Sequence, residues 1–299
     1  MTSLRSYLAP AALYAALLPS VSANFGNSFY LGPWDGDAYI TKATYSLTAP
    51  AVIQDYDTSD TSLWVAIWIG VQPNVADVSQ ANLVQPLLNW CADQTSCGCD
   101  ASATEWCVTA STYTPEGQTG NAYVAVPADA KLDFEIAVNA DTKKIDQTVT
   151  LNGKVVSQLS DSQGMKPQII YSANECSTSG CGTLPDFSWD NVTITLSEAK
   201  SDFGTLISYN GASSDGLKTT DGGITWHADS ISMGKDTDWS IDPSQCKPVS
   251  AQHQATENRM NEKEMRCLEE AAAKYGDEPC FIPILVENRY APPPPDDLS

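Results

Sequence analysis

An unbroken apolar run constrains the fold of this chain more than any other feature. It reads Leu63-Trp64-Val65-Ala66-Ile67-Trp68-Ile69-Gly70. Side chains alternate between the two faces of a β-strand, so a strand made of this run is apolar on both faces. Both faces must be covered, which predicts an inner strand. One face carries Leu63, Val65, Ile67 and Ile69, and the other carries Trp64, Ala66, Trp68 and Gly70.

The second of these faces predicts a ligand site. Its two indoles alternate with the small residues Ala66 and Gly70, and small residues between large aromatic side chains leave room for a ligand. We therefore expect a cleft or groove in which Trp64 and Trp68 project into an open hollow. The alternative is that a loop simply covers both tryptophans.

Between Asn24 and about Asp242 the chain consists of short strand-like segments broken by Gly, Pro, Asn and Asp. Asn152-Gly153 has the composition of a two-residue hairpin turn. These features predict an all-β fold with two packed antiparallel sheets, a β-sandwich. The expected strands are Tyr39–Leu47, Leu63–Val71, Leu83–Trp90, Trp106–Tyr113, Ala122–Val126, Lys131–Val138, Gln147–Leu151, Gln168–Tyr171, Asn191–Leu196 and Gly223–His227.

Residues 1–23 have the pattern of a signal peptide. Arg5 supplies an early charge, an apolar run follows from Tyr7 to Leu18, and Val21-Ser22-Ala23 provides a small-x-small end. We expect cleavage after Ala23. No later stretch approaches the roughly 20 apolar residues that cross a bilayer. The sequence thus predicts a protein of the secretory pathway, extracellular or in the lumen of a secretory compartment, without a membrane span.

The nine cysteines agree with an oxidising compartment, where disulfides persist. Zinc sites need paired ligands at fixed spacing, and this chain has no C-x-x-C and only two histidines, so we predict no metal site. Cys176 is expected to pair with Cys181. The cluster that includes Cys91 and Cys107 is expected to tie neighbouring strand ends, with its connectivity left open. The odd number leaves one thiol free or intermolecular. The full set is Cys91, Cys97, Cys99, Cys107, Cys176, Cys181, Cys246, Cys267 and Cys280.

The formal net charge is -21, and loss of Arg5 with the signal peptide makes it -22. Phosphate binding needs clustered Lys and Arg, and the sequence has no basic stripe, so we expect no nucleic-acid partner. Acidity of this size suits solubility and an acidic extracellular environment. It does not identify a substrate.

Asn191-Val192-Thr193 is an N-x-S/T sequon, and it lies where a strand is expected to begin. In a secreted protein this predicts glycosylation of Asn191.

The last quarter of the chain differs in character. Residues 252–274 are charged and have helical spacing of their apolar positions, and a proline-rich tail follows from Tyr290. We therefore divide the chain into a signal peptide at 1–23, a β-sandwich domain at 24–246, and a helical appendage with its tail at 247–299. We assign the appendage no catalytic role.

Four motifs occur in the order found in the eqolisins, the secreted fungal glutamic peptidases, and the chain resembles that family over about residues 60–196. The motifs are Leu63-Trp64-Val65-Ala66-Ile67, Leu83-Val84-Gln85-Pro86-Leu87, Glu105-Trp106-Cys107 and Leu184-Pro185-Asp186-Phe187. The resemblance implies a concanavalin-like β-sandwich of the jelly-roll type. It also implies a catalytic pair on the concave sheet, in which a Glu activates water and a Gln stabilises the oxyanion. Gln85 falls at the glutamine motif.

The acids of the family are not matched. Trp68 stands where the family has an aspartate, and the strand expected to bring the glutamate, Gln168–Ser172, has no acid. The nearest one is Glu175, and a shift of three residues would place it on the opposite face of the strand. A misplaced base forfeits most of its contribution to water activation, so we do not expect an acid peptidase. A peptidase with rearranged acids stays as an alternative.

What remains is an aromatic cleft with neutral polar groups. Gln85 and Asn89 supply directed hydrogen bonds, and we predict no cofactor. The walls are expected from Trp64, Trp68, Trp90, Trp106, Tyr113 and Tyr171.

We favour an enzyme without acid or base machinery. In general type, the chain resembles fungal secreted lectin-like proteins that act as hetero-Diels–Alderases in secondary-metabolite biosynthesis. A cycloaddition needs two apolar partners held in a reactive orientation, and a hydrogen bond to a quinone-methide carbonyl would assist it. In this interpretation Gln85, with Tyr113 or Tyr171, is the catalytic donor, and the tryptophans and Asn89 bind a small apolar organic substrate.

The alternative from another class is a non-catalytic, lectin-like module that binds a glycan on the same aromatic surface. A deep, enclosed pocket would favour the small-molecule enzyme, and a long open groove would favour the glycan. The sequence leaves the substrate and the oligomeric state open.

Overall fold

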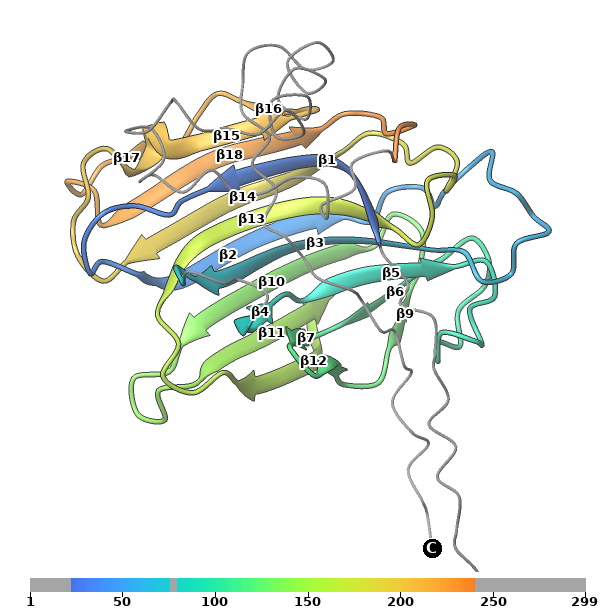
Figure 1. The fold of residues 1–299 in the computed structure, drawn as a ribbon, viewed down its shortest axis with the longest axis horizontal. Coiled ribbons are helices and arrows are strands. Elements are labelled where there is room, and N and C mark those ends of the chain that lie inside the picture. The colour runs from blue at the N-terminus through green and yellow to red at the C-terminus, as the bar shows by residue number, and fades with distance from the viewer. Residues whose placement is uncertain (1–22, 76–79, 240–299) are drawn as a thin grey trace, which may run out of the picture.

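The computed structural model describes residues 23–75 and 80–239. Within them, the prediction of an all-β fold built from two antiparallel sheets is confirmed, and Figure 1 shows the sheets stacked face to face. The expected signal peptide up to residue 22, the helix at 252–274 and Cys246, Cys267 and Cys280 lie outside the described residues.

One layer, called here the β3 sheet, has the order β15-β1-β13-β3-β4-β7-β8; β5 pairs with β3 and β6, and β6 with β9. Every pairing in it is antiparallel, and β3 lies well inside the sheet between β13 and the β4 and β5 strands, as its two-sided apolar pattern predicted. Its strands are β1 (Asn24–Leu31), β3 (Trp64–Pro73), β4 (Leu83–Val84), β5 (Leu87–Cys91), β6 (Trp106–Thr109), β7 (Ser111–Thr114), β8 (Gly117–Gly120), β9 (Val124–Val126), β13 (Pro167–Cys176) and β15 (Ile207–Asn210).

The other layer, called the β2 sheet, has the order β12-β11-β10-β2-β14-β18-β16, and β17 pairs with β18. The predicted hairpin turn at Asn152-Gly153 joins β11 to β12, and both of its residues have the positive φ angles that such turns require. Its strands are β2 (Ile40–Thr48), β10 (Lys131–Val138), β11 (Ile145–Leu151), β12 (Lys154–Asp161), β14 (Phe187–Leu196), β16 (Ala212–Ser214), β17 (Lys218–Thr219) and β18 (Thr225–Met233).

The main core lies between the sheets. From the β3 sheet, Val65, Ile67 and Ile69 enter it, and from the β2 sheet Tyr45 and Trp189 pack edge to face with ring centroids 5.4 Å apart. The Tyr45 hydroxyl donates to the Ile69 carbonyl at 3.0 Å, so the buried phenol is paired as a core phenol must be.

A polar seam joins the two sheets where β6 ends and β7 begins. The Gln147 side chain from β11 accepts a hydrogen bond from the Ser111 backbone N–H at 3.1 Å and donates to the Thr112 hydroxyl at 2.9 Å. The Ser157 hydroxyl from β12 accepts from the Ala110 N–H at 2.9 Å. These side chains satisfy backbone groups that the break in the strand leaves without a neighbour.

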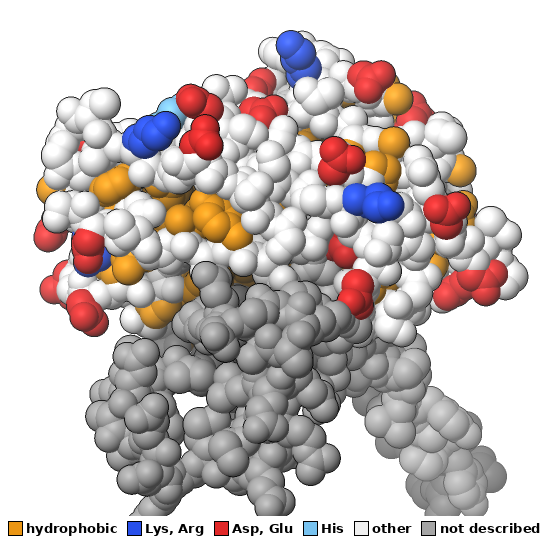
Figure 2. All heavy atoms as spheres, turned by 90° about the horizontal axis from the view of Figure 1, so that it is seen from above, with side chains coloured by type: hydrophobic (Ala, Val, Ile, Leu, Met, Phe, Trp, Pro, Cys, Tyr) orange, Lys and Arg blue, Asp and Glu red, His pale blue; other side chains and the backbone are white. Residues whose placement is uncertain are grey.

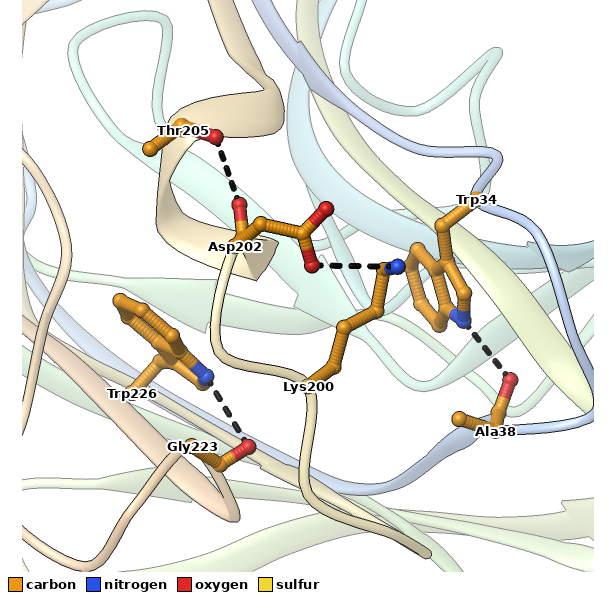
Figure 3. Close-up of polar contacts among 7 residues, drawn as sticks. All are labelled: Trp34, Ala38, Lys200, Asp202, Thr205, Gly223 and Trp226. Atoms are coloured by element: carbon orange, nitrogen blue, oxygen red, sulfur yellow. Dashed lines mark hydrogen bonds and ion pairs between the residues drawn. The ribbon is translucent and has the colours of Figure 1, made fainter.

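The chain crosses from β14 to β15 through a short 3-10 helix, η2 (Phe203–Leu206). Phe203 is fully buried, with its ring against Trp34 and Trp226. Both indoles donate to nearby carbonyls, of Ala38 and Gly223, and Lys200 pairs with Asp202 at 3.1 Å just before the helix (Figure 3). The crossover is thereby packed as part of the core.

Disulfides fix two loops of the β3 sheet. Cys176 pairs with Cys181, as predicted, at the end of β13. The first cluster forms Cys91–Cys97 and Cys99–Cys107, which tie β5 and β6 to the loop between them. Three disulfides indicate that the protein folds in an oxidising, secretory environment.

Replacing Gln147 with Leu should destabilise the domain. The change leaves the Ser111 N–H buried without a partner, which costs about 1–3 kcal/mol, and it removes the hydrogen bond that the Thr112 hydroxyl accepts, although this hydroxyl still donates to Asp161. We expect urea unfolding to report a loss of roughly 2 kcal/mol or more. The control is Gln158→Leu on the neighbouring strand, an exposed glutamine whose loss should change stability by less than about 0.5 kcal/mol. Equal effects would show that the seam does not matter.

Candidate functional site

The outer face of the β3 sheet, turned away from the β2 sheet, carries a second apolar cluster. We call it the Trp68 face. Its side chains alternate along each strand with those that enter the main core. The cluster contains Ala23, Phe25, Trp64, Ala66, Trp68, Leu83, Leu87, Cys91, Tyr113, Ile169, Tyr171 and Ala173. The same alternation places the buried polar residues Gln72, Gln85, Asn89 and Glu175 among them.

The structure brings six of the predicted site residues to this face, namely Trp64, Trp68, Gln85, Asn89, Tyr113 and Tyr171. Trp90 and Trp106 are corrections to the prediction, because they belong to the core between the sheets. Their indoles donate to the carbonyls of Ala103 and Pro50, at 2.8 and 2.9 Å. Trp90 follows Asn89 by one residue, so it must point to the opposite face of β5.

Gly70 forms the floor at the centre of the face. In β3 it lies opposite Tyr171 of β13, and the β4 segment passes on its other side. A side chain at Gly70 would place its Cβ 2.6 Å from Leu83 Cδ1 and 3.1 Å from Gln85 Cβ. The missing side chain therefore lets Leu83 and Gln85 approach β3 closely at Gly70.

Gln85 is held at its backbone and weakly held at its side chain. Its N–H donates to the Ser111 carbonyl at 2.9 Å, which fixes the segment between β4 and β5. The amide Nε2 lies 3.4 Å from Gln118 Oε1, a long contact. The amide Oε1 is buried and has no hydrogen-bond partner among the described residues. An unpaired buried acceptor costs about 1–3 kcal/mol, so this oxygen suits a donor group of a ligand.

Tyr171 is a wall of the site. Its hydroxyl donates to Gln72 Oε1 at 2.9 Å, and its ring meets Trp68 edge to face at 5.0 Å. Burial raises the pKa of Tyr171 well above its ordinary value, and the neighbouring Tyr30 and Glu175 raise it further. The phenol therefore stays protonated at physiological pH, with its proton directed at Gln72. The sequence analysis missed Gln72, although Gln72 is an even number of residues from Trp68 and Gly70 and therefore lies on the same face of β3.

Glu175 is a second correction. It faces the same side as Trp68, since the Trp68 indole N–H donates to its carboxylate at 3.0 Å. Ser172, three residues before Glu175, points the other way: it faces the core, where its hydroxyl accepts a hydrogen bond from the Trp189 indole N–H. The expectation that Glu175 lies on the wrong face is therefore wrong. Glu175 lies four residues after Tyr171, an even spacing, and this spacing in the sequence already indicates that the two side chains share one face of the strand.

Glu175 and Gln85 nevertheless do not form a pair. Glu175 lies opposite Ala66 on β3, whereas Gln85 lies beside Gly70. Four residues of strand separate these positions, about 13 Å at roughly 3.3 Å per residue. The Trp68 indole lies between them and binds the carboxylate. A base and an oxyanion donor must reach one reacting centre, and this spacing prevents it.

The Trp68 face is enclosed, so the expected open hollow is also wrong. Trp64 is 6 % exposed and Trp68 is 0 % exposed. Two cavities formed by described residues lie elsewhere. One of about 500 Å³ is lined by residues that include Pro73, Asn82, Lys166 and Gln168. The other, of about 350 Å³, is lined by residues of β16 and β18 that include Ser213 and His227.

The other buried acid of the described chain is Asp236, on the core side of β13. Its carboxylate accepts hydrogen bonds from the Asn27 N–H at 2.5 Å and from Asn174 Nδ2 at 3.1 Å. Burial raises the pKa of Asp236, and these hydrogen bonds oppose the shift. Asn174 precedes Glu175 and points to the opposite face, so Asp236 is separated from the candidate site by the sheet.

The surface and the remaining groups add few constraints. On the face in Figure 2, Asp and Glu are scattered, and Lys and Arg stand singly among them. Residues 23–75 and 80–239 contain no group of three or more His, Cys, Asp or Glu placed to hold a metal. No helix in this part of the chain has the length and apolarity to cross a membrane.

No family model and no curated protein match this chain. A legume lectin-like domain from Entamoeba histolytica aligns with 9% identity over 71% of this chain and 80% of its own, with a TM-score of 0.28. A β-glucanase from Bacillus licheniformis aligns with 11% identity over 70% and 78%, with a TM-score of 0.29. A galectin from Caenorhabditis elegans aligns with 12% identity over 50% and 93%, with a TM-score of 0.24. Likenesses this low do not place the chain in a family.

Tyr171→Phe should flatten the alkaline loss of stability. The pKa of Tyr171 is raised in the folded protein, and the unfolded phenol has its ordinary pKa of about 10. The contribution of Tyr171 to the free energy of unfolding is therefore fully present below pH ~10. Above that pH it falls by about 1.4 kcal/mol per pH unit, because only the unfolded chain ionises. Urea unfolding across this range should show a slope smaller by one proton in the variant. Well below pH 10, the variant should differ in stability from the wild type only by the lost hydrogen bond to Gln72. An unchanged slope would contradict the burial of this phenol.

Proposed function

We propose that the Trp68 face binds a small organic substrate and promotes a cofactor-independent cycloaddition, of the hetero-Diels–Alder type. The observation that supports this most is the Gln85 amide. It is buried next to Gly70, on the face that carries Trp68 and Tyr171, its Oε1 is unpartnered among the described residues, and its Nε2 has one long contact. Its donor and acceptor together complement a ligand that carries a carbonyl next to a hydroxyl.

The groups on this face suit orientation better than acid-base chemistry. Glycoside hydrolysis uses two carboxylates about 5–9.5 Å apart, and Glu175 is the one acid among the buried polar residues of the described face. Its carboxylate is bound to the Trp68 indole. The Tyr171 proton is likewise committed to Gln72. A reaction at this site must therefore proceed without a proton shuttle from these residues.

A cycloaddition meets that requirement. Two new σ bonds form as π bonds are consumed, and no proton, electron or leaving group passes to the protein. Holding both partners in a reactive orientation can lower the barrier by several kcal/mol. A hydrogen bond from Gln85 Nε2 to a carbonyl of the electron-poor partner strengthens as charge develops on that oxygen. The buried apolar walls of Trp68, Leu87 and Tyr171 would exclude water from the partners.

A non-catalytic glycan site is the second candidate. It is favoured by the acceptors on this face, Gln85 Oε1, Asn89 Oδ1 and the Glu175 carboxylate, which suit sugar hydroxyls, and by indoles on which sugar rings stack. Enclosure of the face argues against a long glycan chain.

The proposal is tested with an ortho-quinone methide, released in solution from a stable precursor, and an apolar alkene. The full chain should accelerate adduct formation and give an excess of one enantiomer, measured by chiral chromatography. Gln85→Leu should lower the rate by about tenfold, equivalent to about 1.4 kcal/mol, and reduce the excess. Gln158→Leu, the exposed control, should match the wild type. Racemic product at the uncatalysed rate, with oligosaccharide binding in a glycan array, would favour the second candidate instead.

A further inference from the structure

We propose that Asn191 carries an N-linked glycan whose first sugars lie in the cavity of about 350 Å³ beside β18, called here the β18 hollow. The sequon predicts only that a glycan is attached at this residue. The inference goes further in assigning the glycan a place on the folded protein. It is independent of the proposed function, because Asn191 belongs to the β2 sheet and the Trp68 face to the β3 sheet.

A bulge turns Asn191 outward in an interior strand. Trp189 and Val192 of β14 both enter the main core, so two residues lie between them instead of the one that strict alternation allows. The register of β14 toward β2 shifts at this point, between Asp190 and Thr193, and Asn191 has a φ of 52°. Asparagine adopts this left-handed conformation more readily than most residues. Asn191 is therefore exposed in the middle of a strand, where an attached glycan displaces no core side chain.

The β18 hollow begins one strand away from Asn191. Asp190 of β14 pairs with Ser230 of β18, and at this register Asn191 lies level with Asp229. The side chain of Asp229 is 92 % exposed, and it lines the hollow. Neighbouring strands lie about 4.8 Å apart, and an asparagine side chain with one pyranose ring reaches farther than this. The first sugars can therefore enter the hollow while the strands stay in place.

The lining of the β18 hollow suits a sugar. Every residue that lines it is polar or charged, apart from Gly216. The His227 imidazole connects the hollow to the sequon, because its Nε2 lies 3.1 Å from Asp229 Oδ1 and its Nδ1 lies 2.9 Å from the Thr193 hydroxyl. Serine hydroxyls, a carboxylate and an imidazole offer the donors and acceptors that sugar hydroxyls and an acetamido group require. A purely apolar ligand would find no matching surface there.

Attachment is tested by secreting the full chain from a yeast, which adds N-glycans in its secretory pathway. Intact mass before and after treatment of the denatured protein with peptide-N-glycosidase should show one glycan on the wild type. Asn191→Gly should carry none and stay folded, because glycine adopts a positive φ without strain. Thr193→Ser, which preserves the sequon, and Thr195→Val, a control on the same strand, should keep the glycan. A wild-type mass that does not change on treatment would overturn the proposal.

The position of the glycan is tested by the rate of its release from the folded protein. Peptide-N-glycosidase must reach the first sugar, so sugars lying in the hollow slow the cleavage. Ser232→Arg places a long side chain in the hollow and should speed release by about tenfold, equivalent to about 1.4 kcal/mol of lost contact. The control Gln158→Arg adds the same side chain on β12, at the other end of the β2 sheet, and should release its glycan at the wild-type rate.

Two further measurements make the result decisive. After denaturation, the wild type and both arginine variants should release the glycan at one common rate, and thermal unfolding checks that each variant is folded. Equal native rates for the wild type and Ser232→Arg would show that the sugars do not occupy the hollow. Faster release from Gln158→Arg as well would contradict the assignment to this hollow. A racemic product in the cycloaddition assay would leave the glycan proposal untouched, because the two concern different sheets.

Discussion

The structure depends on the double coverage of β3. A strand whose side chains are apolar on both faces cannot sit at an edge or against solvent, because each exposed indole or isoleucine would forfeit about 1.5–3 kcal/mol of burial. The chain meets this constraint by placing Val65, Ile67 and Ile69 in the main core and Trp64 and Trp68 in a second cluster. The second cluster is what makes a candidate site possible, because its polar members are buried with the indoles.

Small residues then decide the shape of that site. The alternation of Trp64, Ala66, Trp68 and Gly70 places each indole next to a position with little or no side chain. At Gly70 the space is taken by Leu83 and Gln85, and at Ala66 it is bordered by Asn89 and Glu175. The same face thus has two polar positions separated by an apolar one. In an enclosed setting, an unpaired amide oxygen at each polar position favours a ligand with donors over a purely apolar one.

Much of the fold follows from sequence because local signals were sufficient there. Lys131–Val138 alternates cleanly and forms β10 with those bounds, and Asn152-Gly153 dictates its own turn. Strand β1, by contrast, was missed. Its segment Asn24–Leu31 contains Gly26 and Asn27 at a bulge, where the Asp236 carboxylate, far along the chain, accepts the Asn27 N–H. Such a partner cannot be recognised from local composition.

The residues of the site were predictable only where the alternation of side chains between the two faces of a strand was followed consistently. Gln85 and Asn89 are an even number of residues apart and lie on one face, whereas Trp90 must point to the opposite face. Tyr171 and Glu175 are likewise evenly spaced. Alternation alone could therefore have corrected the assignments of Trp90 and Glu175. The joining of these faces into one surface required the register between β3, β5 and β13, which long-range pairing sets. Burial of the face could not be anticipated from any single strand, because it depends on contacts between segments far apart in the sequence.

The position of Glu175 shows why a carboxylate on an aromatic face need not be a catalytic base. Removing a carboxylate from water is costly unless donors replace the lost solvent, and the Trp68 indole N–H is one such donor. In return, the carboxylate fixes the ring that separates Gln85 from Asn89. An indole held at its nitrogen by Glu175 and at its edge by Tyr171 has little freedom to rotate. A rigid aromatic wall of this kind serves a reaction governed by orientation, and it leaves the acid without the freedom that water activation would demand.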